Sequence, residues 1–199
     1  MSNIRERNRR LIVEAAAAEF ASKGFEASKV EDIAARAGLP KANLYYYFEN
    51  KRDLYACVLD SVMEPILRAA RSLDPQALPE QALQRYIRVK MRVVRQYPHA
   101  CKALVREMLH GAQHVSGRRA ETLRDTARQN LHCLTAWMDK GLITRTAPEH
   151  LLLFLWAMPM AHILVADQPG LTQPRGSSES TVMRIVLRGL RPEIVASAT

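Results

Sequence analysis

The chain has 199 residues and a formal net charge of +9, because 29 lysines and arginines face 20 aspartates and glutamates. Its 48% hydrophobic and 25% charged residues are typical of a folded globular protein and exclude a disordered one. Three widely spaced cysteines without a CxxC pair indicate neither a disulfide framework nor a zinc site. The positive charge leaves nucleic acid, an anionic membrane and an acidic protein open as partners.

No segment has the pattern of a membrane span or a secretory signal. The most apolar stretch, residues 151–166, contains Pro159 and His162 and is shorter than the roughly 20 residues that cross a bilayer. Glu14 interrupts the apolar stretch that follows the basic N-terminus, which a signal peptide would not do. We therefore expect a cytoplasmic protein with no membrane partner.

The spacing of apolar residues predicts an all-α fold. They recur every three or four positions, and the strict alternation of a strand is absent. The expected helices span residues 2–23, 29–37, 41–48, 50–72, 80–97, 98–110, 118–140, 147–167 and 179–190. The second is expected to begin with a capping box formed by Ser28 and Glu31, and Pro159 predicts a kink in the eighth.

Two short helices joined by a glycine turn predict a helix-turn-helix. Small residues at Ala34 and Ala37 let the helices cross closely, and Gly38 takes the sharp turn between them. The second helix carries Lys41, Asn43 and three consecutive tyrosines, which a core helix would not need. Such side chains suit a helix that lies in a DNA groove and contacts phosphates and base edges.

Residues 5–60 resemble the TetR/AcrR-type transcriptional regulators. The motifs that carry the resemblance are FASKGF at 20–25, VEDIAARAG at 30–38 and KANLYYYFENKRDL at 41–54. Further along, Arg88-Val89-Lys90, Tyr97-Pro98 and the stretches 107–112 and 149–157 are similar to the pyrimidine-utilisation regulator branch. The resemblance implies a nine-helix, two-domain architecture. Residues 1–52 would form the DNA-binding domain, and residues 53–199 a domain that binds a ligand and dimerises.

The resemblance also implies which side chains contact DNA. By position in the motif they are Lys29, Val30, Lys41, Asn43, Tyr45, Tyr46, Tyr47 and Lys51. We expect Lys29, Tyr46 and Lys51 to bind phosphates, and Lys41 and Asn43 to read base edges. Leu44 and Phe48 are expected in the core, and Tyr45 is either a contact or a packing residue. Four N-terminal arginines form either an arm beside the groove or a solvated end: Arg5, Arg7, Arg9 and Arg10.

The eighth predicted helix is apolar on nearly all sides, so it must be covered on most of them. We expect one side to pack inward and another to meet a second copy of the chain, with the last helix completing a four-helix interface. The alternative is a central helix that is buried within one subunit. The interface candidates are Leu151, Phe154, Leu155, Met158, His162, Val182, Ile185 and Val186. Two-fold symmetry would make the operator pseudo-palindromic.

A sensor cavity is expected among the helices of the C-terminal region, because Met and aromatic residues can line an adaptable pocket. The candidates are Tyr86, Met91, Cys101, Met108, Trp137 and Trp156. Apolar and aromatic residues at helical spacing also suit an ordinary core, and that alternative stays open. The sequence identifies no effector.

Four arginines share one helical stripe: Arg85, Arg88, Arg92 and Arg95. The stripe is either a site for an anionic ligand or acidic partner, or a solvated face paired with acids of other helices. Residues 1–52 hold only 10 basic and 7 acidic residues, so most of the excess charge lies in the C-terminal region. The placement of particular residues, and not net charge, therefore indicates the DNA-binding region.

No sequence pattern of an enzyme is present: HExxH, GxSxG, a Walker loop and GxGxxG are all absent. His132 and Cys133 are adjacent in a predicted helix and so point to different faces. We expect no catalytic residue, metal or cofactor. The predicted function is a homodimeric repressor that a small molecule releases from double-stranded operator DNA. The alternatives are a small helical enzyme and a basic scaffold protein without sequence-specific DNA binding.

Overall fold

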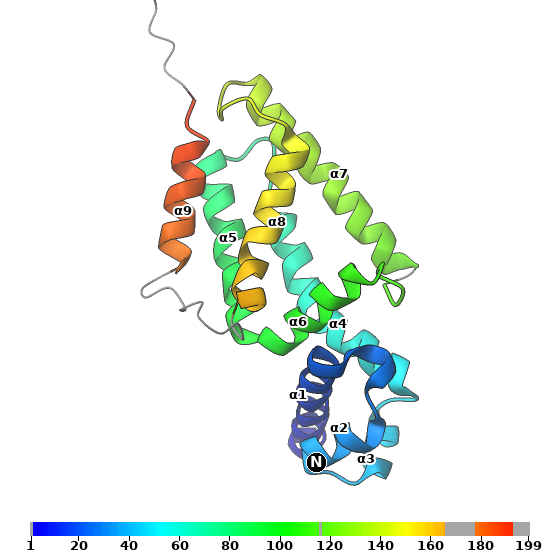
Figure 1. The fold of residues 1–199 in the computed structure, drawn as a ribbon. Helices are drawn as coiled ribbons and strands as arrows, with labels where there is room; N and C mark the ends of the chain where they lie inside the picture. The colour runs from blue at the N-terminus through cyan, green and yellow to red at the C-terminus, as the bar shows by residue number, and fades with distance from the viewer. Residues whose placement is uncertain (1, 116, 166–177, 193–199) are drawn as a thin grey trace, which may run out of the picture. The chain divides into compact units, whose positions relative to one another are not determined.

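The computed structural model describes residues 2–115, 117–165 and 178–192, and nine helices account for all regular structure in these ranges (Figure 1). The helices are α1 (Ser2–Ala27), α2 (Val30–Ala37), α3 (Lys41–Tyr47), α4 (Lys51–Ala70), α5 (Pro79–Gln96), α6 (Pro98–Leu109), α7 (Arg118–Asp139), α8 (Pro148–Val165) and α9 (Ser178–Gly189). The predicted all-α, nine-helix fold is confirmed, and each helix lies where the apolar spacing placed it.

Glycines end the first two helices as expected, but the predicted capping box is wrong. Gly24 breaks α1 with a φ of 82°, and Gly38 ends α2 with a φ of 67°. Both lie in the left-handed region that favours glycine. Ser28 does not cap α2. Its hydroxyl donates a 2.6 Å hydrogen bond to the Gly24 carbonyl and so closes the end of α1. Lys29 is the N-cap residue, without a side-chain hydrogen bond.

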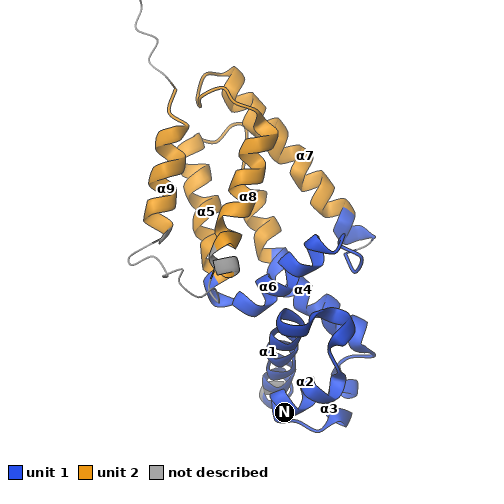
Figure 2. Cartoon of the chain, viewed as in Figure 1, with its two compact units in different colours: residues 1–64, 95–120 blue, residues 65–94, 121–199 orange. Residues whose placement is uncertain are grey.

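The first of two compact units contains residues 1–64 and 95–120 (Figure 2). It holds α1 to α3, most of α4 and all of α6. Its helix-turn-helix is built on the buried side chains of Phe20, Ile33 and Leu44. Lys23 joins α1 to α2 through a 2.8 Å ion pair between its Nζ and Asp32 Oδ2. Apolar contacts below and an ion pair at the surface thus hold α1 against α2.

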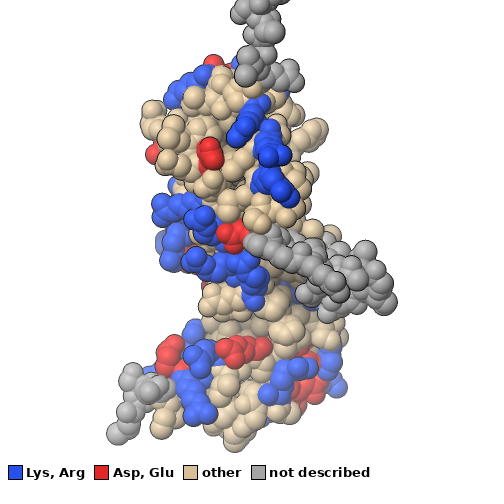
Figure 3. All heavy atoms as spheres, turned by 90° about the vertical axis from the view of Figure 1, so that its left-hand side faces the viewer, with Lys and Arg blue, Asp and Glu red and all other residues tan. Residues whose placement is uncertain are grey.

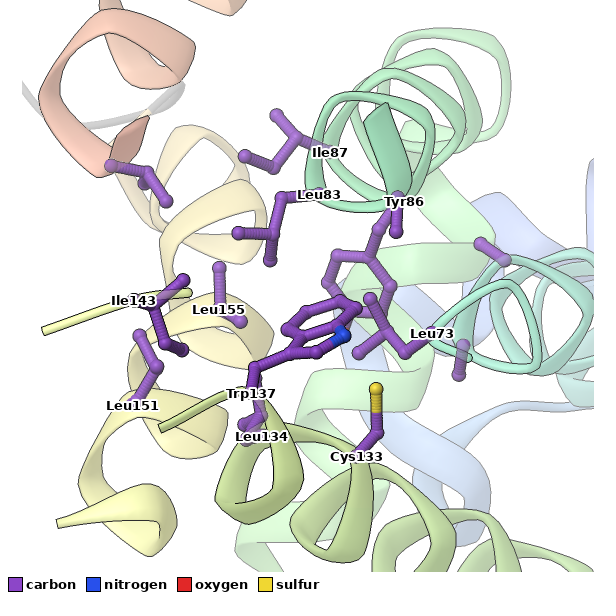
Figure 4. Packing of buried hydrophobic residues seen from close by; sticks show 14 of the residues in the cluster. Leu73, Leu83, Tyr86, Ile87, Cys133, Leu134, Trp137, Ile143, Leu151 and Leu155 are labelled. Carbon is purple, nitrogen blue, oxygen red and sulfur yellow. The ribbon is translucent and has the colours of Figure 1, made fainter. Parts of the chain in front are cut away.

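The second compact unit contains residues 65–94 and 121–199. Its core brings together α5, α7 and α8 around the fully buried indole of Trp137 (Figure 4). Leu83, Ile87, Leu134 and Leu155 surround that side chain. Pro159 lies inside α8, and the kink expected there stays a prediction.

The boundary between the two compact units differs from the boundary between the two predicted domains. The sequence divides the chain at residue 52, whereas the units divide α4 after Glu64 and group α6 with the N-terminal helices. Pro65, inside α4, is the first residue of the second unit. The division into a DNA-binding and an effector domain concerns function and stays a prediction. Within the described ranges, no helix is both long and apolar enough to span a bilayer.

Candidate functional site

Helix α3 has one buried and one exposed side. Leu44 and Phe48 are buried, as expected of core residues. Tyr45 and Tyr46 expose 50% and 66% of their surface, and Asn43 and Tyr47 are half-buried between the two sides. Because hydroxyls, rings and an amide share the accessible side, this helix can offer hydrogen bonds to a partner without any change in its packing.

Lys41 is held across the turn by the helix before it. Its Nζ lies 2.6 Å from Glu31 Oε1 and 5.8 Å from the ring centroid of Tyr45. The hydrogen bond to Glu31 raises the pKa of Lys41 and lowers the pKa of Glu31. Both side chains are exposed, so the ammonium can exchange this partner for another anion.

Lys51 makes contacts within the chain that its position in the motif does not predict. Its Nζ donates to the carbonyls of Phe25 at 2.8 Å, Ser28 at 3.1 Å and Glu26 at 3.2 Å. It also lies 4.4 Å from the ring centroid of Phe25. An ammonium has three hydrogens to donate, so these carbonyls occupy all of them. Lys51 therefore fastens the end of α1 to the start of α4, a role that spacing along the chain does not reveal.

The other DNA-contact candidates border the exposed side of α3. The Arg5 guanidinium carbon lies 5.5 Å from the Tyr46 ring centroid, and the rings of Tyr46 and Tyr47 meet edge to face. Lys29 is exposed at the start of α2, and Val30 beside it is half-buried. Arg9 is also exposed, but it lies against α4, where it donates a 3.0 Å hydrogen bond to Cys57 Sγ. The basic N-terminal residues therefore do not form one uniform arm.

The predicted sensor residues separate into two groups. Tyr86, Met91 and Trp137 belong to one core cluster of the second unit, and Figure 4 labels Tyr86 and Trp137 within it. Cys101 and Met108 belong to the first unit, on α6. Trp156 is 37% exposed on α8 and is not part of that buried cluster. Only the first group forms a continuous interior.

Sequence reasoning missed Lys90 in this interior. The residue is only 1% exposed, and its Nζ lies 4.5 Å from the Tyr86 ring centroid. Burial lowers the pKa of Lys90 to about 7. Its position in the helix could have indicated this burial, because Lys90 follows Leu83, Tyr86 and Ile87 at helical spacing on the apolar side of α5.

The interface candidates also divide. Leu151, Leu155 and Val186 are buried within the core of their own unit, and Met158 and Val182 are half-buried against it. Phe154 and Ile185 are 48% and 60% exposed and line a groove of about 480 Å³ between α8 and α9. The side chain of His162 lies outside the described residues. Two further exposed apolar side chains, Leu153 and Trp156, were not among the candidates.

The arginine stripe of α5 lies at the surface. All four members are exposed, and Arg88 Nε lies 3.3 Å from Glu179 Oε1 on α9. Figure 3, which views the side of α5 and α9, shows basic side chains gathered there with few acidic ones between them. The ion pair favours the interpretation of a solvated, partly paired face for Arg88.

Comparison with known proteins decides the family. Residues 12–58 match the family described as bacterial regulatory proteins, tetR family. Residues 59–193 match the family described as YcdC-like protein, C-terminal region. The chain belongs to the TetR family of transcriptional regulators.

Relatives with established names support this assignment. The chain is 30% identical to the HTH-type transcriptional regulator RutR of Escherichia coli, covering 92% of this chain and 91% of RutR. It is 28% identical to the HTH-type transcriptional repressor NicS of Pseudomonas putida, covering 68% of this chain and 64% of NicS. The predicted transcriptional regulator is thereby confirmed, and the enzyme and scaffold alternatives are not supported.

Solved structures confirm the fold. The ketosteroid transcriptional regulator KstR2 of Mycobacterium tuberculosis matches with a TM-score of 0.75 at 20% identity, covering 93% of this chain and 95% of KstR2. The regulator PfmR of Thermus thermophilus matches with a TM-score of 0.69 at 22% identity, covering 89% and 97%. Regulators of this family bind operator DNA and a small-molecule effector, typically as dimers.

Proposed function

We propose that the chain is a cytoplasmic, homodimeric repressor that a small molecule releases from a pseudo-palindromic operator. The observation that carries the proposal is the two-sided α3, with Leu44 and Phe48 buried beneath exposed Tyr45 and Tyr46. Tyrosine side chains expose large apolar rings at a cost in free energy, so their accumulation on one exposed face favours a binding surface.

Within that surface, we assign roles by chemistry and accessibility. Lys41 and Asn43 read base edges, because lysine donates to guanine and asparagine pairs with adenine. Lys29 and Tyr46 bind phosphates, while Tyr45, Tyr47 and Val30 border the groove. Lys51 acts as a positioning residue, since its three hydrogen bonds to carbonyls hold the helix-turn-helix together.

A second copy of the chain is proposed to cover the exposed apolar face of α8 and α9. That face carries Leu153, Phe154, Trp156 and Ile185, all exposed in the single chain. Large exposed apolar patches on soluble proteins are typical of interfaces. A two-fold axis there would present two α3 helices about 34–36 Å apart, one turn of B-DNA, to the two half-sites of an operator.

Release requires that the effector bind the two conformations of the dimer with different affinity. The effector is proposed to bind in the second unit, and α4, which belongs to both units, to change the spacing of the α3 helices. Such coupling between two sites is typically worth about 1–3 kcal/mol. By linkage, operator DNA must then weaken effector binding by the same factor that the effector weakens DNA binding.

A gel-shift titration with DNA flanking the chain's own gene tests the proposal. We expect Lys41→Ala and Asn43→Ala each to weaken binding by about 5- to 100-fold and to relax base preference at one position. Arg128→Ala is the matched control, since it removes an exposed charge on α7 in the other unit and should bind like the wild type. Unchanged operator affinity in both α3 variants would contradict the assignment.

A further inference from the structure

Among the described residues of the second unit, one charged side chain, that of Lys90, is fully buried. Every other charged side chain described there is exposed except Glu179, which pairs with Arg88. Lys90 is 1% exposed, and no hydrogen bond or ion pair joins its Nζ to any residue that the structure describes. Its described contact is the Tyr86 ring, 4.5 Å from Nζ to centroid, which offsets only part of the cost of burying a charge. Folding alone gives no reason to keep a lysine at this position.

A second polar group in the same interior also lacks a partner. Trp137 is fully buried, and its Nε1 makes no hydrogen bond in the described part of the chain. Trp137 and Tyr86 belong to one buried cluster, whose side chains Figure 4 shows, and the Lys90 Nζ lies 4.5 Å from the Tyr86 ring centroid. The interior therefore holds two buried hydrogen-bond donors, and no described acceptor bonds to either.

The cluster that holds Tyr86 and Trp137 is otherwise apolar. Leu83, Ile87, Met91 and Leu134 belong to the same buried cluster as Tyr86 and Trp137. A positive charge and an N–H donor within such walls are complementary to a molecule that carries an anionic oxygen acceptor on an apolar body. A neutral amide would satisfy the indole and leave the ammonium without its counter-ion.

We propose that the effector is a small apolar carboxylic acid whose carboxylate binds Lys90 Nζ, with its apolar body against Tyr86 and Trp137. The role as effector rests on the function proposed above, whereas the binding site does not. The ion pair would form in a low-dielectric interior, where the contribution of charge to affinity is larger than at the surface. The carboxylate would thus distinguish this effector from a neutral molecule of the same shape.

The proposal predicts that the affinity for the carboxylate depends on pH. The pKa of Lys90 is lowered to about 7 by burial, and a bound carboxylate would raise it again. Below pH 7 the ammonium is already present, whereas above pH 7 binding must take up a proton, so affinity falls by about tenfold per pH unit. Tyr86 and Cys133 are the other buried titratable groups described in this unit, and burial raises the pKa of both, so neither ionises near neutral pH.

Calorimetry on the full-length protein with benzoate and benzamide tests the site, because the two probes share a ring and differ in charge. We expect the wild type to bind benzoate more tightly than benzamide, and about 20-fold more weakly at pH 8.5 than at pH 6.5. Lys90→Met, which keeps the chain length and removes the charge, should lower benzoate affinity by at least about tenfold. Arg92→Met is the control, since it removes an exposed charge from the same helix and should bind benzoate as the wild type does.

Equal binding of benzoate and benzamide, including no binding of either, would overturn the proposal. So would a Lys90→Met protein that binds benzoate like the wild type. The pH series on the wild type keeps the test independent of how well the variant folds. Operator binding is measured separately by gel shift, so a protein that binds benzoate but no DNA would refute the proposed function and leave the carboxylate site standing.

Discussion

The helix-turn-helix and the interior of the second unit use lysine in opposite ways. Lys41 lies at the surface, paired with Glu31 at 2.6 Å, and this hydrogen bond raises its pKa. Lys90 lies in the core beside the Tyr86 ring, and burial lowers its pKa. Water stabilises the charge of Lys41 with or without Glu31, whereas the charge of Lys90 is stabilised only by groups within the interior.

This difference separates two kinds of binding site. A surface lysine exchanges a carboxylate for a phosphate at little cost, which suits a helix that must associate with DNA and leave it again. A buried lysine without a counter-ion destabilises the fold, so its anion contributes both affinity and stability when it binds. The comparison therefore predicts that the first unit responds to salt and the second to one specific anion.

The largest expected effect is a gain in stability from Lys90→Met. Replacing the buried ammonium with an apolar side chain of similar length should raise the free energy of unfolding by about 2–4 kcal/mol at pH 7. Lys90 has a lower pKa in the folded chain than the usual value of about 10.4 in the unfolded chain. Its penalty is therefore complete below pH 7 and disappears as pH rises toward 10.

Urea unfolding of the wild type and Lys90→Met at several pH values measures this difference. The two curves should converge between pH 7 and pH 10, while Arg92→Met should follow the wild type throughout. A Lys90→Met protein that is less stable than the wild type at pH 7 would show that the ammonium is stabilised in the core, and the contrast between the two lysines would fail.

Lys51→Ala should give the next largest effect, and it should be a loss. Removing the ammonium leaves the carbonyls of Phe25, Glu26 and Ser28 without their donor, which should lower the free energy of unfolding by about 1–3 kcal/mol. The salt dependence of DNA binding should stay the same, because a positioning residue releases no counter-ion.

The exposed neighbour Arg52 supplies the control for this measurement. Arg52→Ala removes the same charge from the same turn of α4 and should leave the stability of the protein nearly unchanged. If Lys51→Ala instead reduces the salt dependence of DNA binding without loss of stability, Lys51 binds a phosphate, as its position in the motif implies.

Much of the fold follows from local signals in the sequence. Apolar spacing, Gly24, Gly38 and the prolines fix where helices begin and end, because these depend on neighbouring residues. The capping box failed because the N-cap of α2 is one residue later than predicted. Lys29 takes that position, and the Ser28 hydroxyl donates to the Gly24 carbonyl at the break in α1.

The functional residues show where such signals stop. The motif identified the exposed side of α3, since tyrosines over a leucine already indicate a surface. It could not show that three carbonyls 23 to 26 residues earlier occupy Lys51. Nor could it distinguish Lys90 from the four arginines of α5, because only the packing of other helices determines which cation is buried.

The smallest effect concerns the ion pair that holds Lys41. Glu31→Gln removes the carboxylate that occupies its ammonium and one negative charge from the DNA-facing surface. Both changes favour DNA, so affinity should rise by about two- to fivefold at low salt and less at high salt. Asp125→Asn removes an exposed acid from an ion pair of α7 and should leave DNA affinity unchanged. Weaker operator binding by Glu31→Gln would show that Glu31 positions Lys41 for its base. Lys41 would then be held by its neighbours, as Lys51 is, and would not exchange Glu31 for a phosphate.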